Sequence, residues 1–330
     1  MNIALVGATG AVGQEFLRVF EMLNFPISSL VPLASARSAG KVVKCKGVEY
    51  EIREISADAF EGVDVAFFSA GGDISREFAP KARDRGALVI DNSSAFRMDA
   101  GVPLIIPEVN PDAARAHKGI ISNPNCSTII ALVPLAPIYR EAGLARFIVS
   151  TYQAVSGTGA AAMAELESQL DDIRAGREVK IEAYPHQIAM NALPHVDVFL
   201  DSGFTREEMK MVHETHKILS DDSIKISATC VRVPIMRSHS ESICFETKRK
   251  VSADAVRDIL ANAKGVTVVD EPSEARYPLA LSASGKINVE VGRIREDAVF
   301  ENGLSMWVVG DQLLKGAALN AVQIASLVGG

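Results

Sequence analysis

The first third of the chain alternates short apolar runs with segments whose apolar residues recur at helical spacing. Residues 2–7 (NIALVG) form an almost continuous apolar run, which is typical of a strand buried on both faces. Residues 12–23 place apolar side chains every three or four positions, which predicts a helix packed on a core. The same alternation predicts strands at 29–33, 63–69 and 87–91 and a helix at 74–85. Residues 41–55 fit neither pattern and are predicted to form a hairpin insertion.

The pattern changes near residue 123, where a second domain is expected to begin. Runs typical of strands in an antiparallel or mixed sheet lie at 147–155, 224–233 and 242–247. A strongly apolar helix is expected over 311–327, and its best packing surface is on the first domain. The chain is therefore predicted to be α/β, with a Rossmann-type doubly wound parallel sheet followed by an α+β domain. The predicted division is 1–125 with 311–330, and 126–310.

Composition narrows the class of partner. The 330 residues include 34 Lys and Arg against 41 Asp and Glu, which gives a net charge of −7, and basic runs are absent. This charge balance argues against nucleic acid or anionic lipid and favours small molecules. The longest apolar stretch, 129–138, is about half the length of a membrane span, so no membrane segment is expected. With no signal-peptide pattern before the first strand, the protein is expected to be cytoplasmic.

A glycine-rich loop follows the first strand directly. Its sequence is GATGAVG at 7–13, with the spacing G-x-x-G-x-x-G rather than the usual G-x-G-x-x-G. Glycines there allow a tight turn and a close approach to a pyrophosphate, while the helix that follows offers free N–H groups. The predicted cofactor contacts are Gly7, Thr9, Gly10, Ala11, Val12 and Gly13. The alternative is that these glycines serve only the turn.

The residues after the second strand indicate which dinucleotide would bind. An acidic residue there would hold the ribose hydroxyl of NAD, but the chain has Ser35, Arg37 and Ser38. Two hydroxyl groups and a guanidinium suit a 2′-phosphate. The sequence therefore favours NADP(H).

One cysteine has a context that would activate it. Cys126 follows Asn-Pro-Asn and begins a long predicted helix, whose positive end would stabilise a thiolate. The alternative is a buried apolar residue, which is the stronger interpretation for Cys45, Cys230 and Cys244. No CxxC pair is present, so neither a zinc site nor a disulfide framework is expected.

A second cluster of reactive residue types lies at 232–241, RVPIMRSHSE. His239 is predicted to act as the base for a cysteine nucleophile, and Arg232 can bind a carboxylate through two parallel hydrogen bonds. The alternative is a strand end with solvated charges. The run HETH at 213–216 resembles a zinc motif but has the wrong spacing, so no metal is expected.

In this order, these features resemble the aspartate-β-semialdehyde dehydrogenase family over nearly the whole chain. The resemblance rests on GATGAVG at 7–13, SNPNCST at 122–128, TYQAVSGTG at 151–159 and RVPIMRSHS at 232–240. It implies catalytic roles for three residues, with Cys126 as the acylated nucleophile, His239 as the acid/base and Gln153 as the group orienting the intermediate. It implies that Arg232 binds the substrate carboxylate and Glu207 its amino group, and that Arg97 and Lys210 bind phosphate. Further cofactor contacts implied are Ser156, Gly157 and Gln312.

The resemblance also implies a reaction and an assembly. The reaction is the reversible NADPH-dependent reduction of L-aspartyl β-phosphate to L-aspartate β-semialdehyde through a cysteine thioester, in lysine, diaminopimelate, threonine and methionine biosynthesis. The second domain would be the catalytic and dimerisation domain of a homodimer. Two alternatives stand beside this reading. One is N-acetyl-γ-glutamyl-phosphate reductase, whose cysteine motif resembles His-Pro-Gly-Cys rather than the Asn-Pro-Asn-Cys found here. The other is a non-catalytic NADP-sensing protein.

Overall fold

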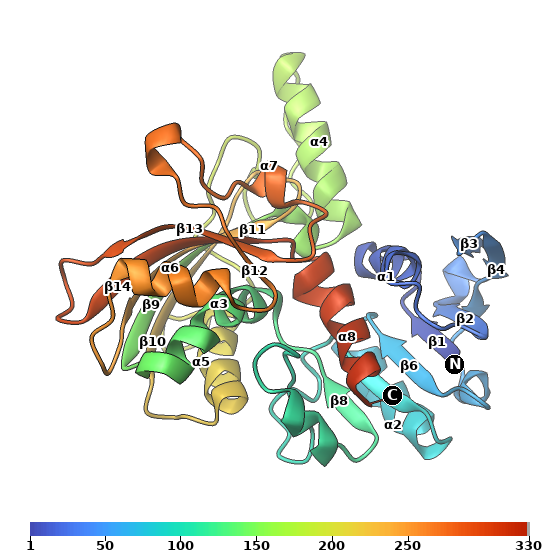
Figure 1. Cartoon of the computed structure of the whole chain (residues 1–330). Helices are drawn as coiled ribbons and strands as arrows, with labels where there is room; N and C mark the ends of the chain where they lie inside the picture. The colour runs from blue at the N-terminus through green and yellow to red at the C-terminus, as the bar shows by residue number, and fades with distance from the viewer. Residues whose placement is uncertain (329–330) are drawn as a thin grey trace. The chain divides into compact units, whose positions relative to one another are not determined.

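The computed structural model describes residues 1–328 and divides the chain into two compact units (Figure 1). Unit 1 comprises residues 1–125 and the C-terminal segment from 316, and unit 2 comprises Cys126–Lys315. The return to unit 1 had been predicted at 311, five residues early. The cause is Asp311, which is fully buried in unit 2 and accepts hydrogen bonds from Arg237 Nε and the Gly285 N–H, both at 2.6 Å.

Unit 1 is built on a six-stranded parallel sheet. In chain order its strands are β1 (Asn2–Val6), β2 (Ser29–Ala34), β5 (Arg53–Glu54), β6 (Val65–Phe68), β7 (Leu88–Asp91) and β8 (Ile120–Ser122). The apolar runs predicted the four strands β1, β2, β6 and β7 but not β5 or β8. Their order in the sheet is β5-β2-β1-β6-β7-β8. The chain therefore winds outward from β1 and then crosses back to β6, which makes a switch point between these two strands. In such sheets ligands bind at the carboxyl ends of the strands beside the switch point.

Three helices pack in unit 1: α1 (Ala11–Met22), α2 (Gly72–Asp84) and α8 (Leu319–Val328). Phe16 and Phe20 of α1 lie against Phe67 of β6, with ring centroids 5.0 and 5.5 Å away. Burying each ring contributes about 1.5–3 kcal/mol, which fixes α1 and the loop before it on the sheet. Short 3₁₀ turns lie at η1 (Ala36–Ser38), η2 (Ala57–Phe60) and η3 (Pro111–Ala116). The predicted hairpin insertion is present as β3 (Val42–Cys45) and β4 (Val48–Glu51).

Unit 2 contains a mixed six-stranded sheet, which confirms the α+β prediction. Its order is β10-β9-β11-β14-β13-β12. The strands are β9 (Arg146–Gln153), β10 (Lys225–Arg232), β11 (His239–Glu246), β12 (Val266–Val268), β13 (Val289–Glu296) and β14 (Gly303–Gly310). The parallel pair β9 and β10 aligns Gln153 with Arg232, and β11 runs antiparallel to both β9 and β14. The sheet therefore brings the ends of several motifs to one edge.

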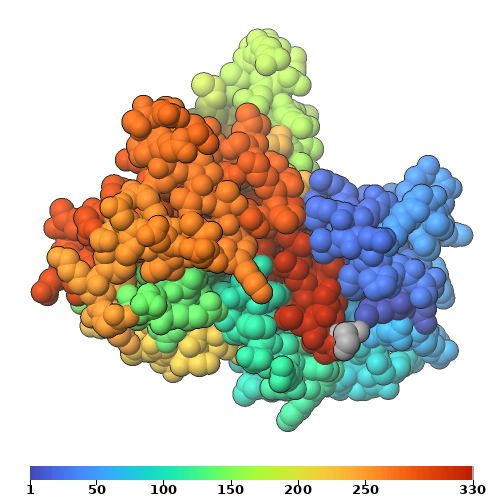
Figure 2. All heavy atoms as spheres, viewed as in Figure 1, coloured from blue at the N-terminus to red at the C-terminus, as the bar shows by residue number. Residues whose placement is uncertain are grey.

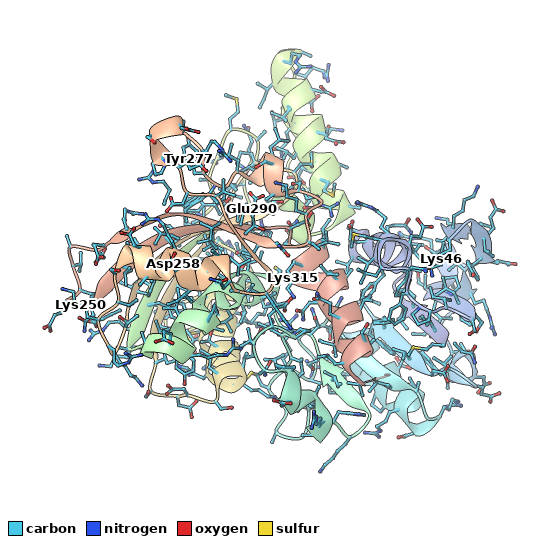
Figure 3. The ribbon with its side chains drawn as sticks, in the orientation of Figure 1. Lys46, Lys250, Asp258, Tyr277, Glu290 and Lys315 are labelled. Atoms are coloured by element: carbon cyan, nitrogen blue, oxygen red, sulfur yellow. The ribbon has the colours of Figure 1, made fainter. Side chains whose placement is uncertain are left out.

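Three helices cover one face of this sheet: α3 (Cys126–Ala142), α5 (Arg206–Leu219) and α6 (Ala253–Ala261) (Figure 1). α4 (Ala160–Arg174) was not predicted, and it projects from the rest of unit 2 (Figure 2). On the other face, Tyr152 and Trp307 lie with ring centroids 5.4 Å apart. The indole of Trp307 donates to the Pro278 carbonyl, beside Tyr277 (Figure 3) and before the short helix α7 (Ala280–Ala283). Unit 2 also holds the 3₁₀ turns η4 (Val155–Gly157) and η5 (Pro272–Glu274), and the π-turn η6 (Leu314–Ala318) crosses into unit 1.

The helix predicted at 311–327 begins as helix α8 only at Leu319. Asp311 caps the preceding turn, because its carboxylate accepts from the N–H groups of Leu313 and Leu314. Among the helices of residues 1–328, none is both long and apolar enough to cross a membrane.

Candidate active site

The glycine loop lies at the switch point of unit 1. Gly7 has φ +85°, and a Cβ there would lie 2.7 Å from the Ser69 carbonyl oxygen, so only glycine fits. A Cβ at Gly13 would lie 2.2 Å from the Gly7 oxygen, so α1 starts tightly against the loop. No side chain caps α1 at Gly10, so its first N–H groups face outward for an anionic ligand. This arrangement fits the pyrophosphate of a dinucleotide.

The turn after β2 presents the residues expected at the ribose. Ser35 precedes η1, and Arg37 lies within it; both are exposed, whereas Ser38 is buried. The Arg37 guanidinium makes no ion pair or hydrogen bond with any of residues 1–328. It is therefore available to a ligand, and a phosphate group suits it.

Cys126 is the first residue of α3 in unit 2 and is not in a disulfide. It is partly exposed, whereas its neighbours Asn125, Ser127 and Thr128 are buried. Ile130, one turn further along α3, fills the space beside Gly310, where a Cβ would lie 2.8 Å from Ile130 Cγ1. Because Gly310 is the strand partner of His239, the first turn of α3 packs close to the histidine.

His239 is completely buried at the start of β11. Its Nδ1 accepts a hydrogen bond from the Ala154 N–H at 3.0 Å, while Nε2 has no partner among residues 1–328. Burial, followed by the nearby Arg232 guanidinium, lowers the pKa of His239 well below its usual value. The neutral ring therefore carries its proton on Nε2, and Nε2 is a donor without a protein acceptor.

Arg232 and Gly157 lie beside this histidine. Arg232 Nη1 donates to the Ala154 carbonyl at 2.6 Å, so one residue, Ala154, holds both side chains. A Cβ at Gly157 would lie 3.2 Å from Arg232 Nη1 and 3.2 Å from His239 Cε1. The absence of a side chain at 157 therefore leaves space in front of both groups. Arg232, His239 and Glu241 of the 232–241 run are thus buried rather than solvated at a strand end.

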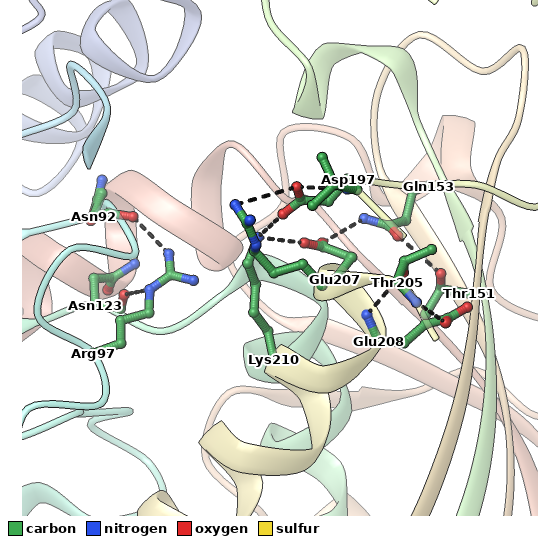
Figure 4. Close-up of polar contacts among 12 residues, drawn as sticks. Asn92, Arg97, Asn123, Thr151, Gln153, Asp197, Thr205, Glu207, Glu208 and Lys210 are labelled. Atoms are coloured by element: carbon green, nitrogen blue, oxygen red, sulfur yellow. Dashed lines mark hydrogen bonds and ion pairs between the residues drawn. The ribbon is translucent and has the colours of Figure 1, made fainter. Parts of the chain in front are cut away.

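A chain of hydrogen bonds extends from Gln153 across α5 (Figure 4). The Gln153 amide accepts from Thr151 and donates to Glu207 Oε1, each at 3.1 Å. Lys210 Nζ donates to Glu207 Oε2 at 3.0 Å and to Asp197 Oδ2 at 2.8 Å. Burial alone would lower the pKa of Lys210, but the Glu207 and Asp197 carboxylates outweigh burial and raise it. Lys210 is therefore a fixed cation.

The predicted cofactor contacts of unit 2 are joined through Gln312. Its amide nitrogen donates to Ser156 Oγ, and its oxygen accepts from the Ser238 N–H at 2.8 Å. Ser238 has φ +72°, a strained backbone conformation for serine, directly before His239. Gln312 thus links the 156–157 turn to the residue that positions the histidine.

Arg97, in unit 1, follows β7. Its Nε donates to the Asn123 carbonyl at 2.9 Å and its Nη2 to the Asn92 carbonyl at 2.7 Å (Figure 4). These carbonyls follow the carboxyl ends of β8 and β7, so the guanidinium is held at that edge of the sheet.

Two side chains of unit 2 were missed by the sequence reading. Asp197 holds Lys210, as described above. Glu241 lies two residues after His239 on β11, is completely buried, and neither carboxyl oxygen has a hydrogen-bond partner among residues 1–328. Its carboxylate lay inside the quoted RVPIMRSHSE run, but only the sheet register reveals its burial.

Comparison with known proteins decides the family. A family model described as semialdehyde dehydrogenase, NAD binding domain, matches residues 2–117, and one described as semialdehyde dehydrogenase, dimerisation domain, matches 135–315. Proteins named aspartate-semialdehyde dehydrogenase are 54% identical in Aquifex aeolicus, over 99% of this chain and 97% of that protein, and 50% identical in Bacillus subtilis, over 98% and 96%. The chain belongs to the aspartate-semialdehyde dehydrogenase family.

A solved member of this family has nearly the same fold. The crystal structure of aspartate semialdehyde dehydrogenase II from Vibrio cholerae, complexed with ASA, superposes with a TM-score of 0.97 at 43% identity, covering 99% of this chain and 98% of that one. As a family member the chain is an oxidoreductase, and unit 1 contains the family's nicotinamide dinucleotide-binding domain. Unit 2 corresponds to the family's dimerisation domain.

Proposed function

We propose that this enzyme reduces L-aspartyl β-phosphate to L-aspartate β-semialdehyde with NADPH, reversibly, through a thioester on Cys126. The observation that carries the proposal is the opposite charge placed around Gln153. The parallel register pairs Arg232 with Gln153, and the Arg232 guanidinium donates to the carbonyl of the next residue, Ala154. The Glu207 carboxylate accepts from Gln153. A substrate with both a carboxylate and an ammonium group, as in an amino acid, complements this pair.

Cys126 would supply the nucleophile. The N-terminus of α3 favours its thiolate over the thiol, and its partial exposure leaves the sulfur accessible. In the reductive direction the thiolate attacks the acyl carbon of the aspartyl phosphate, and the C–O bond to phosphate breaks, which leaves a thioester and free phosphate. Bound NADPH supplies the hydride that a thioester, unlike a carboxylate, readily accepts.

His239 would act as a donor to oxygen. Because Nδ1 accepts from the Ala154 N–H, the neutral ring presents Nε2–H, which stabilises negative charge on the former carbonyl oxygen of the substrate. In this tautomer Nε2 has no lone pair to take the proton of the Cys126 thiol. The thiolate therefore depends on α3 rather than on the histidine.

Phosphate binding is proposed for Arg97 and for Lys210. Both are cations held by fixed hydrogen bonds, Arg97 by the Asn92 and Asn123 carbonyls and Lys210 by two carboxylates. A preference for NADPH over NADH is proposed from Arg37, which is exposed and has no partner among residues 1–328. Contacts from Ser156, Gly157 and Gln312 to the cofactor are proposed on the bonds that join 156 to 312.

The proposal includes a homodimer formed through unit 2 and a place in lysine, threonine and methionine biosynthesis. The face of the unit 2 sheet opposite α3, α5 and α6 exposes apolar side chains such as Ile148, which is 48% exposed and follows the same alternation as Tyr152. Such a face is suited to a second copy. Molecular mass in solution, compared with that of an Ile148→Asp variant, tests the dimer.

The activity itself is tested by phosphate-dependent reduction of NADP with L-aspartate β-semialdehyde. We expect turnover with this aldehyde and far less with N-acetyl-glutamate semialdehyde, whose acylated nitrogen has no charge for Glu207 to bind. Preference for the acetylated aldehyde would replace the proposal with its nearest alternative. Dinucleotide binding without turnover of either aldehyde would favour a sensing protein.

A further inference from the structure

Lys210 lies between two carboxylates, and only one of them has a role in the proposed function. Its Nζ donates to Glu207 Oε2 at 3.0 Å and to Asp197 Oδ2 at 2.8 Å (Figure 4). Asp197 also pairs with Arg206, whose Nη1 lies 4.0 Å from Asp197 Oδ1. The two carboxylates therefore already have two cationic partners, and a substrate ammonium group must compete with Lys210 for Glu207.

Asp197 is held firmly in this position. Its loop is anchored by two hydrogen bonds between the backbones of Leu193 and Arg232, at 2.8 and 2.9 Å, and by the Arg206 N–H, which donates to the Val198 carbonyl at 2.8 Å. Asp197 itself has φ +67°, a conformation that Asp and Asn tolerate better than most residues. Its Oδ1 accepts from the Val198 N–H at 2.8 Å, which leaves Oδ2 facing Lys210.

The two ammonium groups would compete for Glu207. In the proposed function Glu207 binds the substrate amino group, yet one of its oxygens is bonded to Lys210 and the other to Gln153. Two cations at one carboxylate repel each other, so the substrate binds well only if Lys210 has another acceptor to hold it. Asp197 provides that acceptor.

We propose that Asp197 is a positioning residue that holds Lys210 while Glu207 binds the substrate amino group. The inference rests on the proposed function. It makes Asp197 a determinant of specificity for amino-bearing aldehydes. Without the Asp197 carboxylate, Lys210 would pair with Glu207 alone and block the amino subsite.

The test uses Asp197→Asn and two aldehydes, L-aspartate β-semialdehyde and 4-oxobutanoate, which is the same molecule without the amino group. Asn keeps the backbone conformation and the bond from Val198 but loses the charge that holds Lys210. We expect KM for the amino aldehyde to rise about 10-fold, the effect of losing one charge-assisted hydrogen bond, with kcat nearly unchanged. KM for 4-oxobutanoate should not move.

Two further variants make the test specific. Asp201→Asn removes a charge from the same loop, and Asp201 is exposed with no hydrogen bond or ion pair to residues 1–328, so both KM values should stay at the parent level. In a Lys210→Met background nothing competes for Glu207, so Asp197→Asn should no longer change the KM of the amino aldehyde.

Equal changes for the two aldehydes, or an undiminished effect in the Lys210→Met background, would overturn the inference. Glycine also accepts the positive φ at this position, so Asp197→Gly must likewise raise KM for L-aspartate β-semialdehyde and leave KM for 4-oxobutanoate unchanged. Failure of the parent enzyme to use L-aspartate β-semialdehyde would instead overturn the proposed function, so the two failures are distinguishable.

Discussion

The completely buried carboxyl of Glu241 makes folding stability depend on pH, and Glu241→Gln tests this directly. Glu241 lies in the middle of the unit 2 sheet, opposite Thr151 on β9 and Val308 on β14, and neither of its oxygens has a hydrogen-bond partner among residues 1–328. Burial raises the pKa of Glu241 well above its usual value of 4.5. The folded protein therefore keeps a proton that the unfolded chain releases.

The sign and size of the effect follow from this difference. Because the folded state binds the extra proton, the contribution of Glu241 to stability is greatest below pH 4.5 and is lost as pH rises through the pKa of the folded state. The maximal slope for one group is about 1.4 kcal/mol per pH unit. Glutamine has nearly the same shape and no proton to lose, so its advantage over glutamate should grow by about that amount per pH unit.

The assay is denaturant unfolding of the parent and Glu241→Gln at pH 5.5, 6.5 and 7.5. Since the pKa of His239 is lowered, stability is also lost as pH falls below 6.5, but this contribution is common to both proteins and cancels in their difference. Glu246→Gln is the control, because Glu246 lies on the same strand and pairs with the exposed Arg146 at 2.8 Å. A stability difference for Glu241→Gln that is independent of pH, or that increasingly favours Glu as pH rises, would refute the reasoning.

Four substitutions test the site. Cys126→Ala should abolish turnover and leave NADPH binding nearly unchanged, as measured by fluorescence titration; residual turnover would remove Cys126 as the nucleophile. Arg37→Ala should weaken NADPH far more than NADH, and equal losses in Kd would make Arg37 structural. Gly157→Ala should lower kcat about tenfold or more without lowering Tm, because the added Cβ lies 3.2 Å from both Arg232 and His239. An unchanged kcat would show that the space in front of these two side chains is not needed for catalysis. Arg232→Lys keeps the charge but not the planar fork, so KM for the aldehyde should rise while Kd for NADPH stays constant.

The sequence predicted unit 1 well because its strands are continuous apolar runs separated by helix-spaced segments. Helix α1 begins and ends within a residue of the range 12–23, and the predicted hairpin insertion is β3–β4. Strand β5, within the same 41–55 segment, instead joins the main sheet beside β2. Helix α4 was missed although Met163, Leu166, Leu170 and Ile173 recur at helical spacing, and few of its side chains are buried. In unit 2, β11 begins at His239 rather than at the predicted residue 242. The difference arises because Ser240 and Glu241 are polar residues that the sheet buries.

The chemistry at individual motifs was easier to predict than the contacts between them. Cys126 and His239 stand in distinctive local sequences, and the resemblance that those sequences carry implies a thioester mechanism. The tautomer of His239 depends on the backbone N–H of Ala154, which is 85 residues away along the chain. Asp197 lies in a loop with no motif, and its bond to Lys210 spans 13 residues, so only the folded structure reveals that contact.

The central claim is that Cys126 carries the substrate as a thioester, and the most direct measurement is mass spectrometry of the enzyme after incubation with L-aspartate β-semialdehyde and NADP in the absence of phosphate. In this direction the Cys126 thiolate adds to the aldehyde carbon to form a thiohemiacetal, and transfer of its hydride to the added NADP leaves the thioester. Without phosphate the acyl group remains on sulfur. We predict an aspartyl adduct on the peptide that contains Cys126, formed together with NADPH and removed on addition of phosphate. NADPH formation with no adduct on Cys126, or an adduct on another residue, would contradict the account.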